Sequence, residues 1–196
     1  QVTKVDDLGD VSDKSMGFGE FQLDKMCDNP SIALIAKRGS GKTWVIGNIL
    51  KQLLKTDKET DVLIIAPTEK FNKFYSTYFP QSRIVHAYSS ELVSNFLTER
   101  VNNLKSKGII VLDDCLQSKC NWMNDPAILE LFYNGRHYNT SMILSMQFPL
   151  GIRPELRCNF DYAFLLAEDF MSNQKRLYDH YGGMFPTFGS FRESFT

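Results

Sequence analysis

Short, continuous apolar runs recur along this chain, separated by longer stretches in which apolar residues follow helical spacing. Runs without polar alternation are typical of strands buried on both faces. When such strands alternate with helices, they indicate a mostly parallel sheet with helices on both sides. We therefore expect a three-layer α/β fold. The runs cover residues 31–36, 61–66, 83–86, 108–113, 141–146 and 162–166, and the run at 83–86 is the weakest.

Helices are expected between these strands. Residues 43–54 carry apolar side chains at helical spacing,. A further helix is predicted to open at Asp125-Pro126, because proline is accommodated in the first turn. A helix over residues 91–104 would present four apolar side chains on one side, namely Leu92, Phe96, Val101 and Leu104.

The length of the chain bears on its domain organisation. With 196 residues, 43% of them apolar, the chain can fill one domain well but not two. Residues 1–20 are polar and glycine-containing, so we expect an arm or irregular lead-in that could order against a neighbouring subunit. Residues 21–196 are then predicted to form a single domain, with no room for a nuclease.

The composition limits the partners and the compartment. Lys and Arg number 22 and Asp and Glu number 23, so a contact with nucleic acid would need a local basic patch or repeated subunits. The four cysteines lack zinc-site spacing, and we expect small buried or half-buried thiols in a reducing compartment. No apolar run approaches the roughly 20 residues of a membrane span and no signal peptide opens the chain. We therefore expect an intracellular protein without a transmembrane segment.

The stretch AKRGSGKT, residues 36–43, joins the first predicted strand to the first predicted helix. It follows the phosphate-binding pattern GxxxxGK(S/T) except at Ala36, where alanine is tolerable if the backbone stays extended. Gly39 and Gly41 permit the dihedrals that turn backbone N–H groups toward phosphates, and the helix N-terminus adds a positive dipole end. A chance match in an ordinary turn is the alternative, which the flanking strand and helix disfavour.

This loop predicts an ATP site. Lys42 would contact the outer phosphates, and the Thr43 hydroxyl would join the coordination shell of Mg²⁺. The residues expected to contact the nucleotide are Lys37, Arg38, Gly39, Ser40, Gly41, Lys42, Thr43 and Trp44.

A pair of acids follows the apolar run at 109–112. Phosphate-loop ATPases use one acid at such a strand end to hold the Mg²⁺ water shell and a second to polarise the attacking water. Asp113 fits the metal role and would contact Mg²⁺ through water, because Mg²⁺ usually keeps several of its water ligands. Asp114 is the candidate general base, although its side chain is shorter than the more usual glutamate by one carbon–carbon bond, ~1.5 Å. Alternatively, both acids cap the following turn.

Three polar side chains further along the chain are also candidates. Gln147 ends the apolar run at 141–146, and its amide can both donate and accept, as a sensor of the γ-phosphate and the water requires. Arg136 precedes that run and Arg157 follows it. Either arginine could reach the nucleotide of a neighbouring subunit as an arginine finger. Ordinary solvated side chains are the alternative reading for all three.

Taken in order, AKRGSGKT, IIVLDD, GRHYNTSMILSMQFP and IRPELRCNFDYAFLL resemble the FtsK–HerA superfamily of ring-forming DNA pumps. More closely, the chain is similar to the poxvirus-type genome-packaging ATPases of large double-stranded DNA viruses of eukaryotes. The resemblance covers residues 31–166. Its most specific part is an arginine-histidine pair, an apolar strand and a serine-x-glutamine-x-proline ending.

The resemblance implies a P-loop NTPase fold of the RecA-like kind, with the glutamine-bearing strand between the phosphate-loop strand and the acid-pair strand. It implies a homo-oligomeric ring, pentameric or hexameric, that moves double-stranded DNA into a capsid. ATP hydrolysis would drive this movement, with Mg²⁺ as the cofactor. Lys42, Thr43, Asp113, Asp114 and Gln147 would take the roles given above, with Arg136 matching the family's arginine. The ring would dock on capsid or inner-membrane proteins at the packaging vertex, in the host-cell cytoplasm at viral assembly sites or associated with the virion.

A ring of this kind need not be basic all over, because symmetry multiplies one or two lysines on a loop that faces the pore. Contacts to phosphates are blind to sequence, as a genome pump requires. The first candidate loop is residues 117–122 and the second is residues 105–107.

Two other functions stay open. A related motor for DNA transfer or DNA-end processing would use the same catalytic core. An assembly protein gated by ATP, with little hydrolysis, is the second, and aspartate in place of glutamate at position 114 keeps it open.

Overall fold

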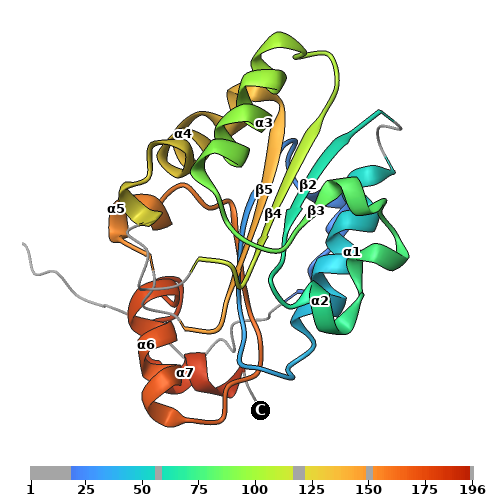
Figure 1. The fold of residues 1–196 in the computed structure, drawn as a ribbon. Coiled ribbons are helices and arrows are strands. Elements are labelled where there is room, and N and C mark those ends of the chain that lie inside the picture. The colour runs from blue at the N-terminus through green and yellow to red at the C-terminus, as the bar shows by residue number, and fades with distance from the viewer. Residues whose placement is uncertain (1–18, 56–58, 117–121, 149–151, 195–196) are drawn as a thin grey trace, which may run out of the picture.

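The structure is a computed structural model, and it describes residues 19–55, 59–116, 122–148 and 152–194. Six parallel strands form one sheet in the order β3-β2-β4-β5-β1-β6 (Figure 1). All six apolar runs of the sequence form strands, and the bounds agree to within one residue at each end. The strands are β1 (Ser31–Ile35), β2 (Asp61–Ile65), β3 (Ile84–Val85), β4 (Gly108–Asp113), β5 (Thr140–Met146) and β6 (Tyr162–Leu165).

Helices cover both faces of the sheet, which accounts for the uninterrupted apolar character of its central strands. On one face lie α1 (Lys42–Leu54) and the short α2 (Glu69–Asn72). On the other lie α3 (Ser90–Asn102) and α4 (Pro126–Asn134), as Figure 1 shows. The remaining helices are α5 (Pro154–Arg157), α6 (Met171–Tyr181) and α7 (Phe188–Glu193). Single 3₁₀ turns occupy Leu23–Lys25, Tyr75–Thr77, Gln81–Arg83, Trp122–Asn124 and Gly135–Tyr138.

Each strand divides its side chains between two cores. In β4, Ile109 and Val111 pack into the core beneath α1. Ile110 and Leu112 pack on the opposite side, into the core beneath α3 and α4, which Leu177 of α6 and Phe191 of α7 extend. Within the described residues, no helix is both long enough and apolar enough to cross a bilayer.

The order of the strands in the sheet decides which strand ends lie next to each other. Strand β5 lies between β1 and β4, in register so that Ile35 pairs with Met146 and Asp113 with Ser145. The glutamine-bearing strand is therefore placed as the resemblance implied, and the expected α/β fold is confirmed. The predicted arm, residues 1–20, lies almost entirely outside the described residues, so the domain boundaries stay a prediction.

The prediction for the inner side of α3 was wrong at three of its four positions. Leu92, Val101 and Leu104 are exposed. The helix instead buries residues at i, i+3, i+4 and i+7 spacing. This set includes the charged residue Arg100, which can be buried because its guanidinium is bonded to Asp61 at 2.6 Å and to the Ser106 hydroxyl at 2.7 Å. A hydrophobicity pattern does not detect such a position. The buried set is Val93, Phe96, Leu97 and Arg100.

The expectation for the cysteines was wrong for two of them. Cys115 is buried beside the acid pair, but Cys27 and Cys158 are exposed. Cys120 lies outside the described residues. Burial, followed by the nearby charge of Asp113, raises the pKa of the Cys115 thiol to about 12, so this thiol stays protonated under ordinary conditions.

The start of β4 provides a test of the packing around Arg100. A Cβ atom at Gly108 would lie 2.7 Å from Arg100 Cδ and 2.7 Å from Thr140 Oγ1. Because Arg100 is held by its ion pair and hydrogen bonds, we expect Gly108→Ala to lower the free energy of unfolding by about 1–3 kcal/mol. Denaturant unfolding measures this. Gly183→Ala is the matched control, since a Cβ there meets nothing within 4 Å, and an equal effect of both variants would contradict the packing described.

Candidate functional site

The loop between β1 and α1 has the backbone geometry that phosphate binding needs. Gly39 and Gly41 have φ angles of 81° and 85°, in the left-handed region that disfavours residues with a side chain. A Cβ atom at either position would meet nothing within 4 Å, so backbone conformation rather than crowding requires glycine. The Ser40 hydroxyl donates to the Lys37 carbonyl at 2.7 Å, which closes the turn.

Alanine at position 36 fits this loop. Its backbone N–H donates to the Met146 carbonyl at 3.0 Å, which continues the β1–β5 ladder by one residue. The methyl group of Ala36 is buried in the core beneath α1. The backbone at Ala36 thus continues the strand and has no positive φ angle that would require glycine.

One cavity, of about 540 Å³, joins this loop to the carboxyl ends of β4 and β5. Most of the site residues predicted from the sequence line it, and Ser40 is the exception within the loop. The cavity also takes side chains from the segment after β2, which the sequence did not suggest. Its lining is Lys37, Arg38, Gly39, Gly41, Lys42, Thr43, Trp44, Thr68, Phe71, Asn72, Asp113, Asp114 and Gln147.

The Lys42 ammonium lies between the two acids. It forms an ion pair with Asp114 and stands 3.9 Å from Asp113 Oδ1. All three side chains are largely withdrawn from solvent, so the attraction is screened less than at a surface. On the other side, Gln147 Nε2 donates to Asp114 Oδ2 at 3.0 Å. The residues that the sequence proposed as phosphate ligand, base and sensor therefore touch one another.

Asp113 is held from two directions by buried hydroxyl groups. Ser145, its pairing partner on β5, donates to Oδ1, and Tyr75 donates to Oδ2 at 2.9 Å. Burial, followed by the charge of Asp113, raises the pKa of the Tyr75 phenol far above its ordinary value, so the phenol stays a donor. Both oxygens of Asp113 thus accept a hydrogen bond, which fixes the orientation of the carboxylate.

Asp114 directly follows β4 and has a left-handed backbone conformation, with a φ angle of 50°. Its N–H donates to the carbonyl and hydroxyl oxygens of Ser145, at 3.3 and 3.2 Å. Because of this turn, the side chains of Asp113 and Asp114 point in different directions. Asp113 continues the strand into the buried hydroxyls, while Asp114 turns to Lys42 and Gln147.

The segment after β2 is braced by a buried acid. Glu69 Oε2 accepts from the Tyr75 N–H at 3.0 Å and Oε1 accepts from the Ser76 N–H at 2.8 Å. Burial by itself would raise the pKa of Glu69, but these backbone bonds outweigh it and lower the pKa. Glu69 does not line the cavity, so its carboxylate holds the segment in shape and does not face the loop.

The two candidate arginines lie outside the cavity. Arg136 precedes β5, at the amino-terminal edge of the sheet, and pairs with Asp161. The hydrogen bond and the charge of Asp161 raise the pKa of Arg136. Arg157 ends α5, where its guanidinium donates to the Ile152 carbonyl at 3.1 Å and lies 5.9 Å from the Tyr181 ring centroid. Neither lines the cavity of its own chain.

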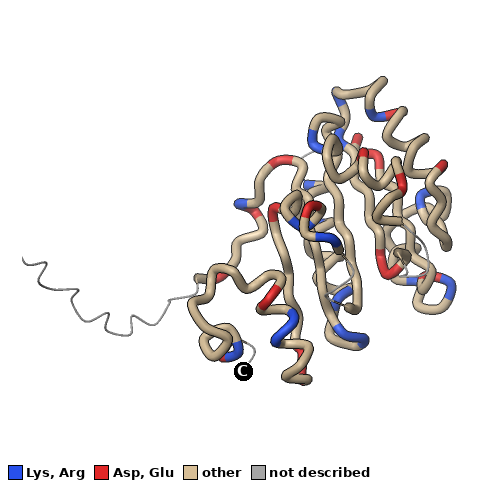
Figure 2. Tube along the Cα trace, turned by 90° about the vertical axis from the view of Figure 1, so that its left-hand side faces the viewer, with Lys and Arg blue, Asp and Glu red and all other residues tan. Residues whose placement is uncertain are grey.

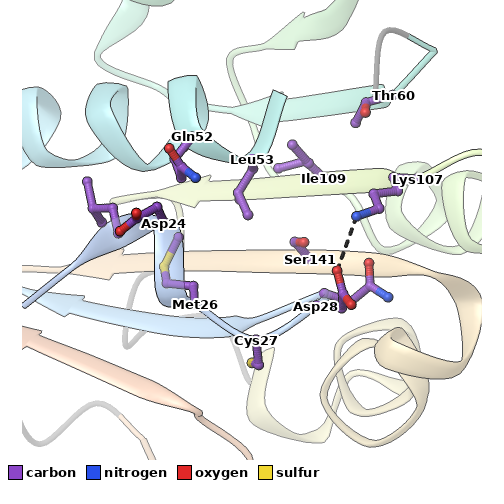
Figure 3. A pocket seen from close by; sticks show the side chains of 12 residues that line it. Asp24, Met26, Cys27, Asp28, Gln52, Leu53, Thr60, Lys107, Ile109 and Ser141 are labelled. Carbon is purple, nitrogen blue, oxygen red and sulfur yellow. Dashed lines mark hydrogen bonds and ion pairs between the residues drawn. The ribbon is translucent and has the colours of Figure 1, made fainter. Parts of the chain in front are cut away.

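The candidate DNA loops give a mixed result. Residues 117–121 lie outside the described residues, and Trp122 is buried. At 105–107, Ser106 is buried against Arg100, and Lys107 pairs with Asp28 at 3.3 Å across a small pocket at the amino-terminal edge of the sheet (Figure 3). Two of the three residues in this second loop are therefore part of the fold, on the edge opposite to the phosphate loop.

The donor set around the cavity suits a magnesium ion carried by a nucleotide. Among the described residues, no cluster of three or more His, Cys, Asp or Glu side chains could hold a metal by itself. Mg²⁺ commonly binds through one or two protein oxygens together with substrate phosphates and water. Thr43 and Asp113 bring a hydroxyl and an oriented carboxylate to the same cavity, which fits this mode of binding.

Residues 18–163 match the family described as Poxvirus A32 protein. The chain belongs to this family, as the order of its motifs predicted. Among curated relatives, the uncharacterized protein L437 of Acanthamoeba polyphaga mimivirus is 40% identical over 181 residues, which are 86% of this chain and 63% of L437. The chain spans less than two thirds of the length of the curated relatives that it matches.

Solved structures share the fold at low identity. The genome packaging NTPase B204 from Sulfolobus turreted icosahedral virus 2, in complex with ATP-gammaS, matches with a TM-score of 0.63 and 16% identity, over 87% of this chain and 88% of that one. The pCW3 conjugation coupling protein TcpA, with ATPgS, matches with a TM-score of 0.57 and 14% identity, over 79% and 52%. These likenesses confirm the P-loop NTPase fold.

Sequence reasoning missed two supports of the site. Ser145 could have been found, because it is a polar residue inside a buried strand and parallel pairing brings the end of that strand to Asp113. Tyr75 gave no signal, since its contact with Asp113 spans 38 residues and depends on how the segment after β2 packs.

The hydrogen bond from Tyr75 to Asp113 generates a stability prediction. Tyr75→Phe removes only the hydroxyl and leaves a buried carboxylate oxygen with one partner fewer. We expect the free energy of unfolding to fall by about 1.5–3 kcal/mol, the usual range for a hydrogen bond to a charged group. Denaturant unfolding at neutral pH measures this. Tyr133→Phe is the matched control, since Tyr133 is exposed, and an equal effect would contradict the contact.

The raised pKa of Tyr75 also predicts a dependence on pH. A tyrosine in the unfolded chain ionises near pH ~10, whereas the folded phenol stays protonated well above that. The unfolded state therefore gains stability by losing a proton as the pH rises above about 10. We expect the stability advantage of the wild type over Tyr75→Phe to be full at neutral pH and to shrink above pH ~10. An advantage that stays constant through this range would contradict the burial of the phenol.

Proposed function

We propose that this chain is the ATPase core of a motor that moves double-stranded DNA into a viral capsid during virion assembly. The observation that carries the proposal is the contact of Lys42, at the start of α1, with the acid pair at the end of β4, across a cavity that the phosphate loop lines. Membership of the Poxvirus A32 protein family supports it. The fold shared with the genome packaging NTPase B204 is consistent with it.

Each site residue then has a task in ATP hydrolysis. The N–H groups of residues 37–41 and the Lys42 ammonium hold the phosphates, with the positive end of α1 behind them. Thr43 and, through water, Asp113 would hold Mg²⁺, which would supply charge neutralisation for the phosphates. Asp113 is suited to this task because Ser145 and Tyr75 fix its orientation.

Asp114 takes the role of general base, with Gln147 beside it. The attacking water gives its proton to the Asp114 carboxylate while its oxygen bonds to the γ-phosphorus, and ADP leaves with the bridging oxygen. The Gln147 amide, already bonded to Asp114 at 3.0 Å, can orient the water through its remaining donor and acceptor positions. The negative phosphates of a bound nucleotide would compete with Asp114 for Lys42. Nucleotide binding would therefore release the base for catalysis.

The positions of the arginines leave them a catalytic role only between copies of the chain. Arg136 and Arg157 lie outside the cavity of their own chain, so each could act only on the nucleotide of a neighbour. We infer a homo-oligomeric ring, pentameric or hexameric, in which one of them offsets charge on the transferring phosphoryl group. The ring would dock on capsid or inner-membrane proteins at the packaging vertex, in the host cytoplasm or on the virion.

A sequence-blind grip on DNA is compatible with the charges of the chain. Along the described residues, the positions of Lys and Arg are interspersed with those of Asp and Glu (Figure 2). A local basic loop repeated around a ring would supply the contacts to phosphates. Residues 117–121 remain the first candidate for that loop, and Lys105 the second.

A second function is favoured by one observation. Asp114, shorter than the usual glutamate, is paired with Lys42 in this structure, an arrangement that suits a protein which binds ATP and hydrolyses it little. Such a protein would use ATP to organise capsid or membrane proteins. A motor for DNA transfer or processing would share the catalytic core and differ only in its substrate.

Two substitutions separate binding from chemistry. We expect Lys42→Ala to abolish ATP turnover and to weaken nucleotide binding, because it removes the charge that faces the phosphates. Asp114→Asn should keep binding but lower ATP turnover by about 10²–10⁴-fold, the usual contribution of a general base. Equilibrium binding and phosphate release, with and without duplex DNA, measure both. Lys51→Ala is the control, since Lys51 lies on the same helix and does not line the cavity.

The outcomes distinguish the functions. A rate of turnover that rises with duplex DNA supports the motor. ATP binding with the same slow turnover in the presence and absence of DNA supports the assembly protein. An affinity for ATP that Lys42→Ala leaves unchanged would show that Lys42 does not face the phosphates, and the whole assignment would fail.

A further inference from the structure

Two largely exposed aromatic side chains line the same cavity as the phosphate loop. Trp44, in the first turn of α1, is 71% exposed, and Phe71, on α2, is 87% exposed. Both line the cavity that also holds Lys42 and the acid pair. An exposed aromatic ring at a binding cavity offers a surface on which a planar ligand group can stack.

The two rings are carried by rigid backbone. Trp44 directly follows the Mg²⁺ candidate Thr43 at the start of a helix of 13 residues. The turn that bears Phe71 is fixed by the Glu69 carboxylate, which accepts two backbone N–H groups, and by Tyr75, which reaches Asp113. Stacking on such rings loses little conformational entropy, because the backbone beneath them is ordered beforehand.

The arrangement of the lining matches the parts of a nucleoside triphosphate. Lys42, Asp113 and Asp114 bring charged groups to the place where the terminal phosphate would lie, and the loop residues 37–41 would follow the phosphate chain. The uncharged Thr68 and Asn72 lie beside Phe71 in sequence and line the same cavity. They offer hydroxyl and amide groups, which can bond the edge of a heterocyclic base. The cavity, at about 540 Å³, is within the usual size for a small-molecule site.

We propose that Trp44 and Phe71 form the base-binding part of this site, stacking on the purine of the nucleotide whose phosphates the loop holds. This inference rests on the proposed nucleotide binding and deepens it. The two rings come from segments that are 27 positions apart in sequence, on α1 and on α2, and the cavity brings them to one ligand. Phe71 therefore belongs to the nucleotide site although it lies in no recognisable motif.

The test compares ATP with inorganic tripolyphosphate, which has the phosphates and lacks the base. The chain has two tryptophans, and Trp122 is 3% exposed, so iodide quenching of fluorescence reports mainly on Trp44. We expect ATP to shield Trp44 from iodide and tripolyphosphate to leave it accessible. Calorimetry should show that Trp44→Ala and Phe71→Ala each weaken ATP binding by about 5–150-fold, as loss of one stacking partner does. Binding of tripolyphosphate should be unchanged.

A matched control is Phe170→Ala, which removes another exposed aromatic ring outside the cavity lining and should bind both ligands as the wild type does. If Trp44 stays accessible to iodide with ATP bound, or if both variants bind ATP normally, the inference is overturned while nucleotide binding stands. Equal weakening of ATP and tripolyphosphate also overturns it, because the rings would then act on the phosphate loop. If the wild type binds neither ligand, the proposed function fails and this inference fails with it.

Discussion

The placement of β5 between β1 and β4 is the constraint on which the rest of the site depends. Parallel pairing in this order aligns three strand ends at one edge: Ile35 with Met146, and Asp113 with Ser145. The phosphate loop, the acid pair and Gln147 each follow one of these ends, so the register of the sheet by itself collects them. The arrangement follows the general rule that open α/β sheets bind ligands at the carboxyl ends of their strands. Figure 1 shows this edge, where β1 turns into the loop that leads to α1.

Within that edge, the two adjacent aspartates receive different environments. Asp113 continues β4 and meets two buried hydroxyl groups, whereas Asp114 takes a left-handed backbone conformation and turns toward Lys42 and Gln147. Two identical side chains thus differ in their surroundings: the Asp113 carboxylate is fixed by buried hydroxyl groups, and the Asp114 carboxylate faces the cavity. This difference supports separate tasks in metal binding and proton transfer. It also shows how a single lysine can link both acids to the phosphate loop.

The edge opposite to the loop carries a different set of charges. Arg136 pairs with Asp161 there, and Lys107 pairs with Asp28. These cations are bound within the fold and lie away from the cavity of their own chain. A role for Arg136 in hydrolysis therefore requires a neighbouring copy, so the proposed catalytic site would be complete only in the assembled ring.

Much of this protein was determined by local sequence. Uninterrupted apolar runs defined the strands, because a strand covered on both faces has no polar side. The loop AKRGSGKT defined the phosphate site, because two glycines, a lysine and a threonine between a strand and a helix have few other uses. The roles of Lys42, Asp113, Asp114 and Gln147 remain proposals, but their proximity follows from strand order, which the family resemblance had implied.

Other features were decided only by the tertiary structure. The inner side of α3 was misjudged because an arginine, Arg100, is buried there through ion pairing that no hydrophobicity pattern reveals. Tyr75, Thr68 and Phe71 reach the site from a segment without a motif, since their positions depend on how the chain packs after β2. A local sequence pattern predicts secondary structure and motifs, because these depend on residues that are close together in the sequence. Contacts between distant segments depend on the packing of the whole chain, and these contacts give Asp113 its orientation and the cavity its aromatic wall.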